Sequence, residues 1–361
     1  MANIDREQRQ KESLCLTIDV EDWFHILESP VVPGIKHWSS LESRIERNLD
    51  KLLTLLDSYS AKCTFFWLGW LAERHKKLVR KCLTAGHEIA SHGYAHVLAH
   101  EAGHKGFYED ITISRDILED ITGEPIRGFR AAGFCTTRET AWVFDMVKEA
   151  GYQYDASIFP APHGHGGMPD GFLGPHFIET QSGYLLEIPS SVVEIFNHRF
   201  CLFGGGYLRL ATRRMIKWGL NRLQADGQPL VVYVHPREID PYHPRLPLPL
   251  SRRFKCYVRL KTTLSKLEWL CREYNVCSML DTAENYIRSF YYEAKIPPVL
   301  SLVNTPQATE SVHNGKAFVK SADKKSCRNR LLQVEGTMAT FVNRDRRRSA
   351  SEEQQLQMTY H

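Results

Sequence analysis

Two histidines and a nearby group of carboxylates have the types and spacing to bind one divalent metal ion. His92 and His96 stand four residues apart in the segment SHGYAH, a spacing that on a helical turn would bring both imidazoles to one side. The segment TIDVED supplies Asp19, Glu21 and Asp22. Two histidines and one carboxylate leave positions open for water and substrate, as catalytic zinc sites require. The sequence therefore predicts a divalent metal centre, with zinc as the expected ion.

Further polar residues could supply the proton transfers that such a centre needs. A carboxylate that does not bind the metal could accept a proton from water. Arg130, in RGFRAAGF, could hold that carboxylate ionised, and His235, in VVYVHP, could donate a proton to a leaving amine. Each group also has a simpler interpretation: a solvated acidic turn, an ordinary salt bridge, a hydrogen-bonded core histidine, or histidines at the surface.

The positions of these residues relative to the predicted strands favour the chemical interpretation. Continuous apolar runs predict parallel strands that are covered on both faces. Because the carboxyl ends of barrel strands meet at one mouth, the charged residues that end five of these runs should converge there. The predicted strands are 14–19, 62–68, 88–92, 127–130, 152–156, 185–189 and 230–235.

Helical patterns alternate with these strands, so we predict the α/β class and an incomplete α/β barrel. The stretches 160–180 and 240–252 are rich in Gly or Pro and are predicted to be long loops, which are often functional. The predicted helices are 41–57, 71–85, 107–122, 137–150, 212–226 and 261–274.

Composition bounds the class of protein. The 361 residues contain 46 Lys/Arg and 42 Asp/Glu, and residues 301–361 account for the whole excess of +4. Residues 1–300 are therefore neutral overall, which argues against a nucleic-acid-binding protein. The sequence contains no run of about 18 apolar residues, so no membrane span is predicted. The polar N-terminal segment 1–12 has no apolar region typical of a signal peptide. We therefore expect a cytoplasmic location or peripheral attachment at the inner membrane face, with the nine cysteines reduced.

Taken together, the motifs resemble the polysaccharide deacetylases with a NodB homology domain, carbohydrate esterase family 4. TIDVED, SHGYAH and RGFRAAGF resemble the first three motifs of that family, and YDASIFP and VVYVHP resemble its later ones. The segments GGGYLRL and HPREIDP are similar to a branch found in bacterial exopolysaccharide gene clusters. The resemblance implies a distorted (β/α)7 barrel. It predicts a catalytic domain over 13–290, with a C-terminal extension from about 200 and a basic, disordered tail over 297–361.

The resemblance assigns roles to individual residues. Asp19 would be the general base and Arg130 would hold it, His235 would be the general acid, and His92 and His96 would bind the metal. The family motif has two adjacent aspartates, whereas here Val20 follows Asp19, so the third ligand is open between Asp22 and Glu21. We favour Asp22 because aspartate is the ligand type of the family.

The implied activity is removal of N-acetyl groups from an amino-sugar polysaccharide or its precursor. The aromatic rings of Trp23, Phe134 and Phe159 would form the floor of the sugar site, unless they pack in the core. Asp155 would also contact the substrate. Two alternatives remain: hydrolysis of a small cyclic amide by an allantoinase-like enzyme, and a catalytically inactive glycan-binding protein.

Overall fold

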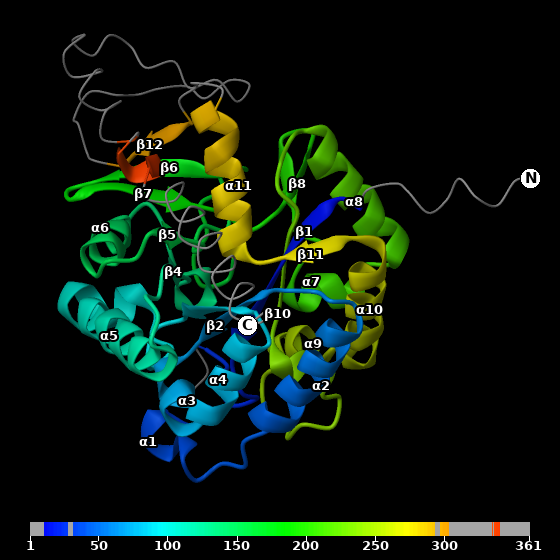
Figure 1. Ribbon diagram of the computed structural model, residues 1–361. Coiled ribbons are helices and arrows are strands. Elements are labelled where there is room, and N and C mark those ends of the chain that lie inside the picture. Colours follow the sequence, from blue (N-terminus) through cyan, green and yellow to red (C-terminus); the bar gives the residue numbers. More distant parts are fainter. Residues whose placement is uncertain (1–10, 28–31, 293–296, 303–333, 335, 340–361) are drawn as a thin grey trace, which may run out of the picture.

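Seven parallel strands form the centre of the molecule (Figure 1). The computed structural model describes residues 11–27, 32–292, 297–302, 334 and 336–339. Most strand residues are buried on both faces of the sheet, which explains their continuous apolar sequences. The seven strands confirm the predicted ones and are, in order of pairing, β10 (Val231–Val234), β1 (Ser13–Val20), β2 (Thr64–Trp67), β3 (Glu88–Ser91), β4 (Gly128–Phe129), β5 (Tyr154–Asp155) and β7 (Gly183–Glu187).

The barrel is incomplete between β7 and β10, which do not pair with each other in the described part of the chain. Ser191, just after β7, bridges the opening: its hydroxyl donates to the Pro229 carbonyl at 3.1 Å and accepts from the Val231 amide at 2.9 Å. The predicted distorted (β/α)7 barrel is therefore confirmed, with its seam closed by a side chain in place of a strand ladder.

Helices surround the strands (Figure 1). The apolar stripe of α2 buries Ile45, Leu49, Leu52, Leu53 and Leu56, which is the face that its sequence period predicts. The helices are α1 (Ile35–Trp38), α2 (Ile45–Ser58), α3 (Gly69–Arg74), α4 (Lys76–Thr84), α5 (Ala99–Thr122), α6 (Trp142–Glu149), α7 (Gly205–Leu210), α8 (Arg213–Ala225), α9 (Leu250–Tyr257), α10 (Thr263–Glu273) and α11 (Met279–Tyr292). Short 3-10 turns are η1 (Ala132–Phe134), η2 (Pro236–Ile239) and η3 (Leu260–Thr262).

Further short strands lie outside the predicted set. The prediction of an unstructured loop over 160–180 is wrong at its end, because β6 pairs antiparallel with β7 there. These strands are β6 (His176–Thr180), β8 (Val193–Ile195), β9 (His198–Phe200), β11 (Asn275–Cys277) and β12 (Val299–Ser301).

The C-terminal part of the chain belongs to the fold more fully than its sequence suggests. The segment after residue 200 contributes β10, which pairs with β1 inside the barrel. Within the predicted tail, β12 pairs with β6, and Val334 and Met338 are buried in an apolar cluster with residues of α11. The prediction of a disordered tail is therefore wrong for these residues. The rest of it, and residues 1–10 of the predicted lead, lie outside the described residues.

Two compositional expectations concern the described residues. None of the helices in the described part of the chain is both long enough and apolar enough to cross a membrane. Eight cysteines fall in that part, and no disulfide joins any two of them there.

Candidate metal centre and active site

Polar residues gather at the carboxyl ends of four strands. Asp19 lies near the end of β1, His92 follows β3, Arg130 follows β4 and His235 follows β10. Because β10 and β2 flank β1, and β3 and β4 are next along the sheet, these strand ends open on one mouth. The barrel thus brings together residues that are more than 200 positions apart in the sequence.

Glu21, His92 and His96 form a compact, buried group. Their ligand-type atoms all lie within 4.8 Å of one another. Glu21 Oε1 is 3.3 Å from His92 Nε2 and 3.1 Å from His96 Nε2. His92 Nδ1 lies 2.7 Å from the Arg130 carbonyl, which can only accept, so Nδ1 is the protonated nitrogen and Nε2 points its lone pair at the group.

The two histidines converge through a loop, and the predicted helical turn is wrong. Gly93 and His96 both have left-handed backbone angles, with φ of 76° and 53°. Asp110, on α5, holds this loop by accepting hydrogen bonds from the Tyr94 and Ala95 amides, each at 2.8 Å. A side chain at Gly93 would meet the Asp110 carboxylate at 2.5 Å, so this position needs glycine.

The carboxylate beside the histidines is Glu21, and the favoured candidate Asp22 lies elsewhere. One Asp22 oxygen accepts from the Ser43 hydroxyl at 2.6 Å and the Arg44 amide at 2.8 Å, and the other accepts from the Trp23 amide at 2.8 Å. Its hydrogen bonds therefore bind Asp22 to the segment that leads into α2. Glu21, and not Asp22, lies beside the histidines because the chain turns tightly after β1. In this turn the Glu21 amide donates to the Asp19 carbonyl at 2.9 Å.

The group fits a divalent metal ion. His96 Nε2 is buried and, despite its closeness to Glu21, makes no hydrogen bond with any described residue. Such an orphaned nitrogen is costly unless a ligand satisfies it. One carboxylate and two imidazole nitrogens also form the donor set of many catalytic zinc sites.

Asp19 lies beside this group and is held by Arg130. Asp19 Oδ1 accepts from Arg130 Nη1 at 2.6 Å, and both side chains are buried. Arg130 also donates to the Thr17 hydroxyl at 2.8 Å and to the Ala156 carbonyl at 3.2 Å, and its guanidinium stacks 4.2 Å from the Phe66 ring centre. These contacts fix the guanidinium, so Asp19 keeps a cationic partner on one oxygen and presents the other to the site.

His235 completes the mouth opposite Asp19. Its Nε2 lies 4.0 Å from Asp19 Oδ2 and 3.5 Å from Glu21 Oε1. Its side chain keeps 14% of its surface exposed, against 2% for Asp19 and 4% for Glu21. His235 is therefore the group of the three that a substrate entering the mouth would meet first.

Glu238 orients the His235 ring, a residue that the sequence analysis missed. Glu238 Oε2 accepts from the His235 amide at 3.0 Å and lies 3.2 Å from Nδ1, while Oε1 pairs with Arg209 at 3.0 Å. Burial opposes ionisation, but Arg209 and His235 outweigh it and lower the pKa of Glu238 to about 2. The signal available in the sequence was the segment HPREID, which places a glutamate three residues after the histidine.

The charges of the group act on one another strongly. Burial would raise the pKa of Glu21, but the nearby imidazoles of His96 and His235 hold it well below its usual range. Burial would lower the pKa of His235, yet Glu21 and Glu238 raise it above its usual value. The site thus favours an ionised carboxylate beside a protonated His235.

His25 is a second residue that the sequence analysis missed. It is buried, its Nδ1 accepts from the Asp22 amide at 2.8 Å, and its Nε2 has no hydrogen-bond partner among the described residues. Its ring lies 6.2 Å from that of His96. His25 stands in the same segment as the acidic cluster. A single histidine between aromatic and apolar residues, however, gave no indication in the sequence that it would lie near the metal-binding group.

The predicted substrate-binding residues lie behind the site. Trp23, Phe134 and Phe159 are 6%, 5% and 1% exposed, and the Trp23 indole donates to the Glu42 carbonyl. Asp155 is fully buried, accepts from the Ser157 hydroxyl at 2.6 Å and is the strand partner of Glu187. Because the three rings are buried, they support the alternative in which they pack in the core, and not the one in which they stack on a sugar.

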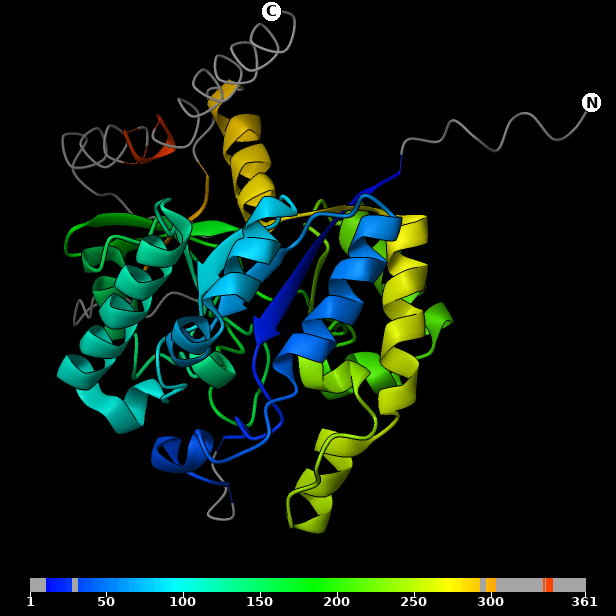
Figure 2. The same cartoon turned by 60° about the horizontal axis from the view of Figure 1, so that its bottom comes forward.

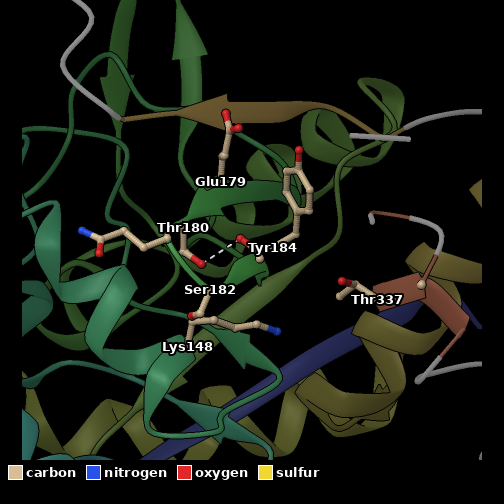
Figure 3. Close-up of a pocket in the computed structure, with 9 residues that line it drawn as sticks. Lys148, Glu179, Thr180, Ser182, Tyr184 and Thr337 are labelled. Atoms are coloured by element: carbon tan, nitrogen blue, oxygen red, sulfur yellow. Dashed lines mark hydrogen bonds between the residues drawn. The ribbon is translucent and has the colours of Figure 1, made fainter. Parts of the chain in front are cut away.

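A separate pocket of about 610 Å³ lies beside the hairpin of β6 and β7 (Figure 3). It is lined by Lys148, residues 179–184, Gly336 and Thr337, beside the first residue of β7. None of the site residues described above lines it.

Comparisons with known proteins agree with the motifs. The family model described as polysaccharide deacetylase matches residues 33–154, which include His92, His96 and Arg130. Residues 33–154 are therefore similar to the polysaccharide deacetylase family. A second model, described as a domain of unknown function (DUF3473), matches residues 156–284, where His235 and Glu238 lie. Asp19 and Glu21 precede both matched ranges.

Two curated proteins match part of this chain. It is 33% identical over 103 residues to peptidoglycan-N-acetylglucosamine deacetylase of Bacillus cereus, covering 28% of this chain and 46% of that protein. It is 28% identical over 116 residues to peptidoglycan deacetylase of Helicobacter pylori, covering 31% and 38%. The chain thus spans less than half the length of these relatives.

Solved structures share the fold. The crystal structure of a protein described as a polysaccharide deacetylase from Mycobacterium smegmatis has a TM-score of 0.54 at 19% identity, covering 83% of this chain and 96% of that one. The crystal structure of an allantoinase has a TM-score of 0.50 at 17% identity, covering 78% and 92%.

Proposed function

We propose that the protein is a metal-dependent deacetylase that removes N-acetyl groups from an amino-sugar polysaccharide or its precursor. The observation that supports this most is the closeness of Asp19 and His235 to each other and of His235 to Glu21 of the Glu21–His92–His96 group. A carboxylate and an imidazolium whose nearest oxygen and nitrogen are 4.0 Å apart can act as base and acid on one small substrate group between them.

In this proposal Glu21, His92 and His96 bind the metal, for which zinc is the expected ion. A metal bound there would polarise the amide carbonyl and make water more acidic. Asp19 Oδ2 accepts a proton from the attacking water, while Arg130 keeps Oδ1 paired. The water oxygen bonds to the acetyl carbon and the carbon–nitrogen bond breaks.

His235 supplies the second proton transfer. Its Nε2 donates a proton to the sugar nitrogen as that nitrogen leaves, so the products are acetate and a free amine. Glu238 and its partner Arg209 hold the imidazole in place for this donation. The Glu238 carboxylate, 3.2 Å from Nδ1, supports the role, because an adjacent negative charge favours the protonated imidazole that a general acid needs.

Acetate release from N-acetylglucosamine oligomers by zinc-loaded protein tests the proposal. Asp19→Asn should lower kcat by about 100-fold or more, because general-base catalysis typically contributes that much. Asp50→Asn, at a half-exposed α2 carboxylate that pairs with Lys81, is the control and should match wild type. A folded Asp19→Asn variant with wild-type kcat would refute the assignment of the base.

A further inference from the structure

Residues 241–261, here called the α9 arm, form a basic surface with exposed apolar side chains. The arm contains six Lys/Arg and no Asp/Glu, in a chain whose basic and acidic residues are nearly balanced. Its large side chains Tyr242, Leu250 and Phe254 are 73%, 83% and 57% exposed. Leu250 and Phe254 are four residues apart on α9, so they lie on the same side of that helix.

The base of the arm is firmly packed. Leu248, Tyr257 and Leu260 are buried in one apolar cluster with Ile26. The Tyr257 hydroxyl accepts from the Leu246 amide at 2.9 Å. The buried Arg209 guanidinium donates to the Lys255 and Cys256 carbonyls at 2.7 and 2.8 Å. The exposure of the three apolar side chains is therefore a property of a folded, anchored element.

The arm lies beside the mouth of the site. It follows η2, which begins directly after His235, and its cluster includes Ile26, just beyond the Asp19–His25 segment. Arg252 donates a hydrogen bond to the Leu27 carbonyl. In Figure 2 the strand β1 points to the end of the molecule from which the yellow-green segment with α9 projects.

Basic residues alternate with the apolar ones along the arm. Arg245, Arg253, Lys255 and Lys261 are exposed, and Lys261 Nζ lies 5.9 Å from the Tyr242 ring centre. Exposed apolar side chains on a segment whose charged residues are all basic are typical of surfaces that lie in the headgroup region of a bilayer. Clustered Lys and Arg select anionic lipid by charge, while Tyr, Leu and Phe enter the boundary with the acyl chains.

We propose that the α9 arm docks the protein on a membrane surface that contains anionic phospholipid. Docking places the mouth next to the lipid surface, so a substrate held at a membrane meets His235 without a diffusion step through bulk water. This last consequence depends on the proposed deacetylase function, whereas docking itself does not.

Vesicle sedimentation of the full chain tests the docking. The protein should sediment with phosphatidylglycerol–phosphatidylcholine vesicles and stay in the supernatant with phosphatidylcholine alone. Leu250→Ser/Phe254→Ser should lower the partition coefficient about tenfold or more, because buried apolar area drives interfacial binding. Arg253→Gln/Lys255→Gln should lower it by a similar factor, because each basic residue adds to the attraction.

Matched controls separate docking from general effects. Ile113→Ser, at a 49% exposed apolar residue of α5, and Lys76→Gln/Lys77→Gln, on α4, should bind as wild type does. Circular dichroism should show every variant folded. Vesicle binding that is unchanged in both arm variants, or equal for both lipid compositions, would overturn the proposal. The proposal would also be overturned if the wild-type protein did not bind vesicles but formed a dimer that the Leu250→Ser/Phe254→Ser variant did not form. In that case a second copy of the chain would cover the arm.

Discussion

The backbone carbonyl of Arg130 lies 2.7 Å from Nδ1 of His92. The same residue donates from its guanidinium to Asp19 at 2.6 Å. Arg130 therefore sets the orientation of a proposed metal ligand through its backbone and that of the proposed base through its side chain. Because a barrel strand end fixes the carbonyl, the relative position of His92 and Asp19 is built into the sheet.

Separate amide substitutions of Glu21 and Asp22 distinguish their roles. Glu21→Gln should weaken zinc affinity by about 100-fold or more, beyond the 10–100-fold typical of residues that only support a ligand. Asp22→Asn should keep zinc affinity within about threefold, because its oxygens are bonded to the start of α2. Titration calorimetry with zinc measures both. Loss of zinc in Asp22→Asn but not in Glu21→Gln would reverse the assignment.

Local sequence patterns predicted the barrel but could not choose between these two carboxylates. The apolar runs of β1 and β10 are local signals, and each became a strand of the sheet. The choice of Glu21 depends on the turn after β1 and on contacts of Asp22 with Ser43, twenty-one residues away. Likewise, the left-handed backbone at His96 lies in a loop that Asp110 of α5 holds, and no periodicity indicates it.

Glu238→Gln tests whether Glu238 positions the proposed acid. We expect kcat to fall by about 10–100-fold with little change in KM or zinc content, because the ring loses its charged partner and not its contact with substrate. Glu268→Gln, at an exposed carboxylate of α10, is the matched control. A wild-type kcat for folded Glu238→Gln protein would leave Glu238 with a structural role alone.

Glu88 should make stability depend on pH. Burial, partly offset by hydrogen bonds from Thr64, Tyr154 and the Leu280 amide, raises its pKa from 4.5 to about 7. The folded state therefore binds more protons than the unfolded state between these values, so this group's contribution to stability falls as pH rises from 4.5 to 7. The loss is about 3 kcal/mol at most.

Thermal unfolding of Glu88→Gln measures that contribution. The variant should lose the part of the pH dependence between pH 5 and pH 8 that Glu88 supplies, because glutamine does not titrate. Its stability relative to wild type should therefore be greater at pH 8 than at pH 5. Identical pH dependence in the two proteins would contradict the raised pKa.

Burial of Val334 and Met338 predicts that the C-terminal part of the chain stabilises the fold. Val334→Asp/Met338→Asp should lower the free energy of unfolding by about 3 kcal/mol or more, because two charges would enter an apolar cluster. Ser301→Asp, at an exposed residue of β12, should change it little. Urea unfolding gives both values, and equal midpoints would show that this packing contributes no stability.

Acetate release with and without metal tests the central claim most directly. Zinc-loaded wild-type protein should release acetate from N-acetylglucosamine oligomers, chelation should abolish the release, and stoichiometric zinc should restore it. Acetate release at the same rate by chelated protein, verified free of metal by elemental analysis, would contradict a catalytic metal at Glu21, His92 and His96.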